Sequence, residues 1–108
     1  MGKKSEYFKK TGIYQIRNTV NGMIYIGSSI NIAARWREHK YDLNMNKHRN
    51  QHLQSAYNKY GKDAFVYEVL EVLDEGSKEK QFEREQYWID LKEACNKKKD
   101  ITFRMRFL

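Results

Sequence analysis

The feature that most constrains the fold is a pair of β-rich runs near the start of the chain, separated by a short polar spacer. The runs cover Thr11 to Arg17 and Gly22 to Ser28, and the four spacer residues are Asn18-Thr19-Val20-Asn21. Asparagine in a spacer that is followed by glycine favours the tight connection of a β-hairpin. We therefore predict two antiparallel strands joined by this four-residue loop.

Each predicted strand carries one tyrosine, within the strings Gly12-Ile13-Tyr14 and Tyr25-Ile26-Gly27. Side chains alternate between the two faces of a strand, so residues that pair across an antiparallel hairpin share a face. The longer loop predicts that Tyr14 lies directly opposite Tyr25, with Cβ atoms about 5 Å apart. A tight Asn21-Gly22 turn would keep both tyrosines on one face but roughly 13 Å out of step. An ordinary cross-strand aromatic pair would give the same pattern, so the tyrosines alone do not assign a function.

Apolar spacing and turn residues predict the remaining elements. In chain order these are a helix from Ser28 or Ser29 to about Leu43, a helix from about Asn50 to Tyr60 that ends at Gly61, a strand over Phe65 to Leu73, and a helix from Ser77 to about Ala94. The tail, 97–108, has no clear pattern, and we expect it to be irregular and partly mobile. Because the chain has no repeat, no proline and no linker, we predict a single domain over 1–108 with its core at about 11–96.

The charge balance favours a polyanionic partner. Lysine and arginine number 21 against 14 acidic residues, which gives a net charge of +7 and an isoelectric point near 9.5. Neutralising phosphates with such a surface releases condensed counterions. A basic surface that only keeps a protein soluble has the same composition, so charge alone leaves nucleic-acid binding as one of two interpretations.

Several classes of protein are excluded by composition. No segment approaches the roughly 20 consecutive apolar residues that span a bilayer, and the polar N-terminal residues lack the apolar region of a secretory signal. Cys95 is the single cysteine, which excludes an internal disulfide and a multi-cysteine zinc site. We expect an intracellular, cytoplasmic protein that is associated with nucleic acid, is not secreted and binds no membrane.

Two residues of the first predicted helix suit work on a phosphate. Arg35 and His39 are four residues apart and therefore lie on the same helix face. The planar arginine fork binds a phosphate with two hydrogen bonds and keeps its charge at any relevant pH, and histidine can transfer protons near neutrality. A solvated basic face would look the same, so this pair also needs further context.

Glu85 gives that context, because its carboxylate falls within the apolar stripe of the last predicted helix. On a helical wheel it lies between Phe82 and Ile89 on one side and Trp88 on the other. A buried carboxylate needs a partner because an unpaired buried charge is costly. One partner would be Arg35 or a lysine in a structural ion pair. The other would be a divalent cation, since Mg²⁺ is often held by a carboxylate together with waters and phosphate oxygens.

Taken together and in order, these motifs resemble the GIY-YIG nuclease domain, most closely the catalytic domain of phage and intron-encoded homing endonucleases. Besides the two tyrosine strings, the resemblance rests on Ser28, on Arg-Trp-Arg-Glu-His at 35–39, on Tyr-Asn-Lys-Tyr-Gly at 57–61 and on Glu-Arg-Glu-Gln-Tyr-Trp-Ile at 83–89. It covers nearly everything from Thr11 to Asn96. The functional positions that it implies are Tyr14, Tyr25, Arg35, His39, His48, Glu85 and Asn96. The chain departs from the family pattern near its end, where Asn96 follows Cys95 and the three lysines at 97–99 have no counterpart.

The resemblance implies a small α/β (α+β) fold, in which a three-stranded antiparallel sheet has the first strand in its middle and helices on its flanks. It also implies an enzyme that hydrolyses phosphodiester bonds of double-stranded DNA in one displacement, leaving 5′-phosphate and 3′-hydroxyl ends. Glu85 would hold one Mg²⁺ or Mn²⁺ ion. A DNA target would be recognised by a separate region or by a partner, or the domain would act as a stand-alone nuclease that chooses DNA by its shape.

The same resemblance suggests roles for the side chains. We expect Tyr14 to be the general base, helped by His39 or by metal-bound water, and Tyr25 to position water or phosphate, although the reverse assignment remains open. A phenol with its usual pKa of about 10 is a poor base near neutrality, so its pKa must be lowered by Arg35 and the cation.

Arg35 would also stabilise the transition state, His48 would contact substrate or a proton, and His52 is expected to be a surface residue. The alternatives are a structure-specific repair nuclease, resembling the N-terminal module of the excinuclease C subunit, and a noncatalytic nucleic-acid-binding domain.

Overall fold

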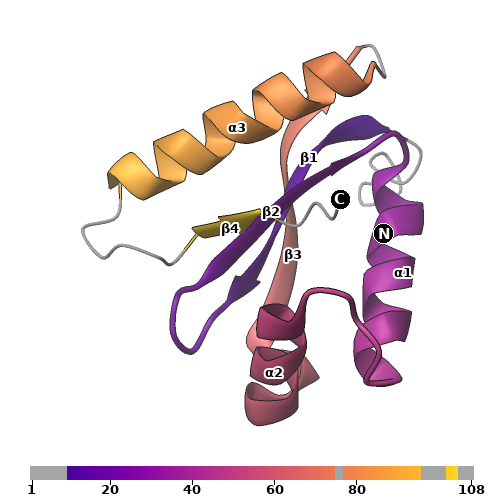
Figure 1. The fold of residues 1–108 in the computed structure, drawn as a ribbon, viewed down its shortest axis with the longest axis vertical. Coiled ribbons are helices and arrows are strands. Elements are labelled where there is room, and N and C mark those ends of the chain that lie inside the picture. Colours follow the sequence, from indigo (N-terminus) through magenta and orange to yellow (C-terminus); the bar gives the residue numbers. More distant parts are fainter. Residues whose placement is uncertain (1–9, 75–76, 96–101, 105–108) are drawn as a thin grey trace.

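The computed structural model describes residues 10–74, 77–95 and 102–104, and its centre is a sheet whose strands run in the order β3-β1-β2-β4 (Figure 1). The strands are β1 (Thr11–Asn18), β2 (Ile24–Ser29), β3 (Phe65–Leu73) and β4 (Thr102–Arg104). β1 pairs antiparallel with both β2 and β3, so the predicted three-stranded antiparallel sheet with the first strand in its middle is confirmed. β4 was not predicted, because three residues are too short to show an alternating pattern; it pairs parallel with β2.

Three helices and one 3₁₀ turn complete the described chain: α1 (Ile32–Asn44), α2 (Gln51–Tyr60), η2 (Lys62–Ala64) and α3 (Lys78–Cys95). The cap of α1 differs from the prediction. The side chain of Asn31, rather than Ser28 or Ser29, accepts the backbone N–H of Ala34 at 3.1 Å. The expected cap of α3 is present, since the Ser77 hydroxyl accepts the backbone N–H of Lys80 at 3.1 Å. Asn50 likewise caps α2.

The hairpin register differs from the predicted one by two residues. Tyr14 pairs with Gly27 and Tyr25 pairs with Ile16, so the prediction that the two tyrosines lie directly opposite each other is wrong. The cause is the connection, which extends from Asn18 to Met23 and is stabilised by asparagine side chains that accept the backbone N–H groups of Val20 and Met23. A shift of two residues keeps every side chain on its face. Both tyrosines therefore share a face, as predicted, but as diagonal neighbours.

The sheet separates two apolar clusters. One face packs against α1 and α2 in a cluster that includes Tyr14, Ile16 and Tyr25. The other face packs against α3 in a cluster that includes Ile13, Ile26 and Ile89. Figure 1 shows α3 crossing the sheet at a distance from α1 and α2. The tyrosines and the helix that carries Glu85 therefore belong to opposite faces of the sheet.

A close approach at Gly12 fixes how β1 meets its neighbours. A Cβ atom at this position would overlap the backbone carbonyl oxygen of Glu71 on β3 and would lie 3.1 Å from Ile32 Cδ1 at the start of α1. The β1–β3 pairing has a bulge immediately beyond, between Ile13 and Tyr14, and bulges re-aim the side chains next to them. The missing side chain of Gly12 thus allows β1 to lie close to β3 and to the start of α1, two residues before Tyr14.

We predict that Gly12→Ala destabilises the fold by about 1–3 kcal/mol, because a backbone oxygen cannot move aside as a flexible side chain would. Thermal and urea unfolding would measure the loss. Ser55→Ala, at an exposed position of α2, is the matched control and should change the free energy of unfolding by less than about 0.5 kcal/mol. A Gly12→Ala protein as stable as this control would contradict the prediction.

Candidate active site

Tyr14 is held between the sheet and α1. Its side chain has no exposed surface, and its hydroxyl lies 2.6 Å from Nε2 of His39. The ring of Trp36, one turn earlier on α1, meets the Tyr14 ring edge-on at 6.2 Å and 88°. Contacts from two residues of one helix therefore fix both the ring and the hydroxyl of Tyr14.

The hydrogen bond to Tyr14 is the last in a chain that begins at a backbone amide. The N–H of Asn50 donates to Nδ1 of His48 at 3.0 Å, and Nε2 of His48 lies 2.8 Å from Nδ1 of His39. A backbone amide can only donate, so Nδ1 of His48 must accept, and a neutral His48 ring carries its proton on Nε2. The Nε2–H group of His48 therefore donates a hydrogen bond to Nδ1 of His39. The neutral His39 ring then carries its own proton on Nε2, facing Tyr14. We assign the direction of the chain on this ground.

Burial keeps both rings of this chain neutral. It lowers the pKa of His39 to about 3, with further contributions from His48 and Arg35, and it also lowers the pKa of His48. His39 is therefore a neutral donor to the Tyr14 oxygen near neutrality, and the hydroxyl proton of Tyr14 must point elsewhere.

That Arg35 and a cation together lower the pKa of the tyrosine base stays a prediction, because the surrounding residues alone shift the pKa of both candidate tyrosines upward. Burial raises the pKa of Tyr14 strongly; the charge of Arg35 opposes this shift, and that of Glu85 adds to it. Burial also raises the pKa of Tyr25 to about 12. Arg35 thus has the predicted direction of effect on Tyr14, but desolvation is the larger effect because a phenolate loses its hydration in this interior.

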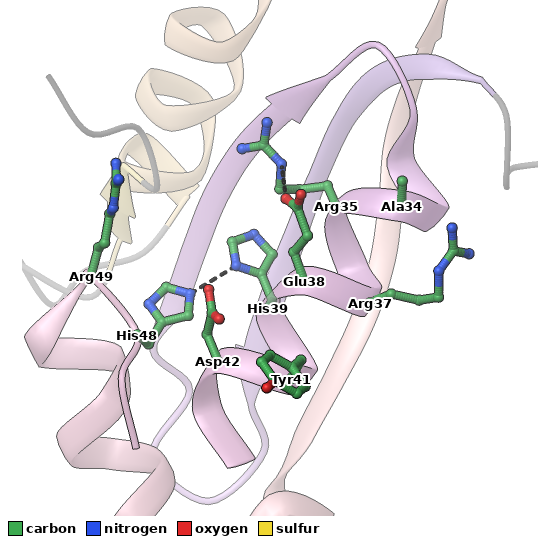
Figure 2. A pocket seen from close by; sticks show the side chains of 9 residues that line it. All are labelled: Ala34, Arg35, Arg37, Glu38, His39, Tyr41, Asp42, His48 and Arg49. Atoms are coloured by element: carbon green, nitrogen blue, oxygen red, sulfur yellow. Dashed lines mark hydrogen bonds and ion pairs between the residues drawn. The ribbon is translucent and has the colours of Figure 1, made fainter. Parts of the chain in front are cut away.

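His39 and His48 open onto a surface groove with a volume of about 690 Å³ (Figure 2). The groove joins three of the predicted site residues, Arg35, His39 and His48, which come from α1 and from the loop before α2. Figure 2 shows Arg35 paired with Glu38 and the two imidazoles linked to each other. The other lining residues are Ala34, Arg37, Tyr41, Asp42 and Arg49. Three arginines against two carboxylates suit an anionic ligand.

Glu85 is buried as predicted, but it does not line this groove. It has no exposed surface, and its Oε1 accepts a hydrogen bond from the Ser28 hydroxyl at 3.2 Å. The predicted stripe of α3 is also rotated. Phe82 is 47% exposed, whereas Gln81, Glu85 and Ile89 form the buried row. Across the sheet, the charge of Glu85 raises the pKa of Tyr14, but burial has a larger effect.

The second tyrosine has a partner that sequence reasoning missed. The Tyr25 hydroxyl lies 2.8 Å from Nδ1 of His52, on the first turn of α2. His52 is exposed, as expected, but it also contacts a predicted site residue. The available signal was the position of His52 one turn after His48, at the start of a predicted helix. Asn96, the remaining predicted site residue, lies outside the described residues.

Within the described part of the chain, no group of three or more histidine, cysteine or acidic side chains is placed to hold a metal ion. No helix among the described residues is both long and apolar enough to cross a membrane.

Comparisons with known proteins agree on one family. The family model for the GIY-YIG catalytic domain matches residues 10–99. The chain is 40% identical over 80 residues to intron-associated endonuclease 1 of enterobacteria phage T4, which covers 74% of this chain and 32% of the relative. It is 42% identical over 69 residues to a probable intron-encoded endonuclease 1 of Neurospora crassa, which covers 64% and 21% respectively. The chain thus spans a third or less of the length of these curated relatives.

Solved structures extend the agreement to the fold. The catalytic domain of the homing endonuclease I-TevI superposes with a TM-score of 0.75 at 33% identity, over 91% of this chain and all of that one. A mutant of the same catalytic domain gives a TM-score of 0.70 at 38% identity, over 81% and 89%. A family model that matches nearly the whole described chain, together with these structures, shows that the chain belongs to the GIY-YIG family of endonuclease catalytic domains.

Proposed function

We propose that this domain hydrolyses phosphodiester bonds of double-stranded DNA with a single divalent cation, leaving 5′-phosphate and 3′-hydroxyl ends. The observation that carries the proposal is the directed chain from Asn50 through His48 and His39 to the oxygen of Tyr14, beside a groove that contains arginines. A fixed proton donor aimed at a phenol oxygen stabilises the phenolate, which is the form that can accept a proton from water.

Tyr14 is the general base in this proposal. Its oxygen accepts the His39 Nε2 hydrogen bond at 2.6 Å, so loss of the hydroxyl proton leaves the phenolate already solvated by one donor. Arg35 stabilises the same charge from the groove side. Because burial opposes ionisation, the phenolate is a minor species near neutrality, and a cation bound with the substrate would increase its population.

Arg35 has a second role, stabilising the negative charge that develops on the phosphate. In the described structure it pairs with Glu38 at 3.2 Å, and both side chains are well exposed. Exposed pairs of this kind contribute little free energy, so Arg35 can exchange Glu38 for a phosphate at small cost. Arg37 and Arg49 would bind neighbouring phosphates along the groove. These contacts do not read sequence, and we propose that recognition of a target belongs to a separate region or a partner.

Glu85 is the proposed ligand of the cation, Mg²⁺ or Mn²⁺. Its chemistry fits, because Mg²⁺ is commonly bound by one or two carboxylates together with waters and substrate phosphates. A bound cation would neutralise charge on the scissile phosphate and make a bound water more acidic. Tyr14, Tyr25 and Glu85 have no exposed surface, so the chain segments that cover these side chains would have to move when DNA binds.

Nicking of supercoiled plasmid at low salt tests the activity without a known target sequence. We expect nicking with Mg²⁺ or Mn²⁺, none with EDTA, and loss of metal-dependent nicking in Glu85→Gln, which keeps the shape of the side chain. Glu83→Gln is the matched control, since Glu83 lies on the same helix, is exposed and pairs only loosely with Lys80 at 3.9 Å. Equal nicking by both variants would refute the role of Glu85.

Arg35→Ala should lower kcat by about 10²-fold to 10³-fold, the loss found when one transition-state donor is removed. Arg35→Lys should recover only part of the rate, because an ammonium group keeps the charge but lacks the fork. Thermal stability should be unchanged, since the pair with Glu38 is exposed. DNA affinity, measured by fluorescence anisotropy, should fall far less than kcat. A loss of affinity that accounts for the whole rate effect would contradict the transition-state role.

The pH dependence of the rate follows from the direction of the Tyr14 shift. Since burial raises its pKa, Tyr14 is mostly protonated near neutrality, and the phenolate fraction increases about tenfold per pH unit below that pKa. We therefore expect log kcat for single-turnover nicking to rise with pH with a slope near one between about pH 6 and pH 9. A flat profile, with chemistry shown to be rate-limiting, would exclude Tyr14 as the base.

Stability should have a separate pH dependence that arises from His39. Its pKa is lowered from 6.5 to about 3 in the folded state, so the unfolded chain binds more protons between these values. Stability is therefore lost on acidification below the unfolded pKa, by about 2 kcal/mol for His39 alone between about pH 7 and pH 5. Urea unfolding at both pH values measures this change. His39→Gln should show a smaller change, and an equal change in both proteins would contradict a neutral, buried His39.

A further inference from the structure

Tyr25 and His52 form a second tyrosine–histidine pair, beside the pair of Tyr14 and His39. Each tyrosine comes from a different strand, and each histidine comes from a different helix on the same face of the sheet. The Tyr25 hydroxyl lies 2.8 Å from His52 Nδ1, and the rings are 5.7 Å apart at 49°. Tyr25 is expected from the family resemblance to position water or phosphate, whereas His52 has no role in the proposed function.

The position of His52 is fixed by the start of α2. The neighbouring Leu53 is fully buried in the core, and its backbone N–H donates to the Asn50 side chain at 3.1 Å. The backbone N–H of Asn50 also begins the hydrogen-bond chain to Tyr14. One helix start therefore places both the His48 ring and the His52 ring, and His52 Nδ1 has a defined place beside the Tyr25 oxygen.

The phenol of Tyr25 is able to donate a hydrogen bond in this second pair. Burial raises the pKa of Tyr25 to about 12, so its hydroxyl keeps its proton near neutrality. A phenol O–H is a good donor to the unprotonated nitrogen of a neutral imidazole. Donation to His52 Nδ1 would fix the rotation of the hydroxyl and, with it, the directions of the lone pairs on the Tyr25 oxygen.

We propose that His52 is a positioning residue for the nuclease reaction, which holds the Tyr25 hydroxyl so that its oxygen accepts a hydrogen bond from the attacking water. The inference rests on the proposed function, because it needs a water that attacks a phosphate. It divides the work between the two tyrosines. The Tyr14 oxygen accepts a hydrogen bond from His39 and, as the phenolate, takes one proton from water, whereas the Tyr25 hydroxyl donates a hydrogen bond to His52 and its oxygen orients that water.

The first test compares two replacements of His52. His52→Asn places a carbonyl oxygen near the position of Nδ1 and can still accept the Tyr25 hydroxyl, whereas His52→Phe keeps a ring but no acceptor. In single-turnover nicking we expect kcat to fall about 10-fold in His52→Phe with KM unchanged, and less than about threefold in His52→Asn. Gln51→Ala, at the exposed neighbouring position, is the control and should behave as the wild type. Equal kcat in His52→Phe and the wild type, or equal impairment of both replacements, would overturn the proposal.

A double-mutant cycle with Tyr25→Phe separates positioning from a general effect on the helix. If His52 acts through the Tyr25 hydroxyl, His52→Phe should cause no further loss of kcat in a Tyr25→Phe background. Additive losses would show that His52 acts independently of Tyr25 and would overturn the proposal.

The hydrogen bond itself can be observed without catalysis. Side-chain ¹⁵N NMR of the wild type at alkaline pH should show Nδ1 of His52 unprotonated, with a chemical shift that changes in Tyr25→Phe. A protonated Nδ1, or no change in the variant, would overturn the assignment. Absence of nicking by the wild type with either metal would refute the proposed function, whereas wild-type nicking that is insensitive to His52→Phe would refute only the role of His52.

Discussion

The hydrogen bond from the backbone N–H of Asn50 to His48 Nδ1 determines the direction of the two bonds that follow it, from His48 to His39 and from His39 to Tyr14. An amide cannot reverse its role, so one fixed donor sets the tautomers of His48 and His39 and the direction of the bond to Tyr14. The same residue caps α2 with its side chain. Helix initiation and active-site polarity thus share one residue, and a displacement of that helix start would disturb both.

The fold was largely predictable because its elements have strong local signals. Alternation in the first two strands, the apolar run at Phe65 to Leu73 and the cap at Ser77 each specify local structure without long-range information. The burial of Glu85 was also predictable, since a carboxylate within an apolar stripe is unusual. The buried face of α3 is rotated by part of a turn from the predicted one, because the polar residue Gln81 is buried there in place of Phe82.

Other features depend on geometry that a linear pattern does not encode. The hairpin register was set by asparagine side chains within the connection, which lengthen it and shift Tyr14 opposite Gly27. The contact of His52 with Tyr25 required the angle at which α2 meets the sheet. The direction of the Tyr14 pKa shift required the balance between burial and the charge of Arg35, and residue types alone do not give that balance.

The neutral state of His39 and His48 has a consequence for how the charge of the groove depends on pH. The positive charge there comes from Arg35, Arg37 and Arg49, and guanidinium groups do not titrate in water. The imidazoles, which would otherwise gain charge on mild acidification, stay uncharged because they are buried. The charge of this groove is therefore nearly constant across the physiological range of acidity, so in the proposed function the chemical step would respond to protons and the capture of DNA would not.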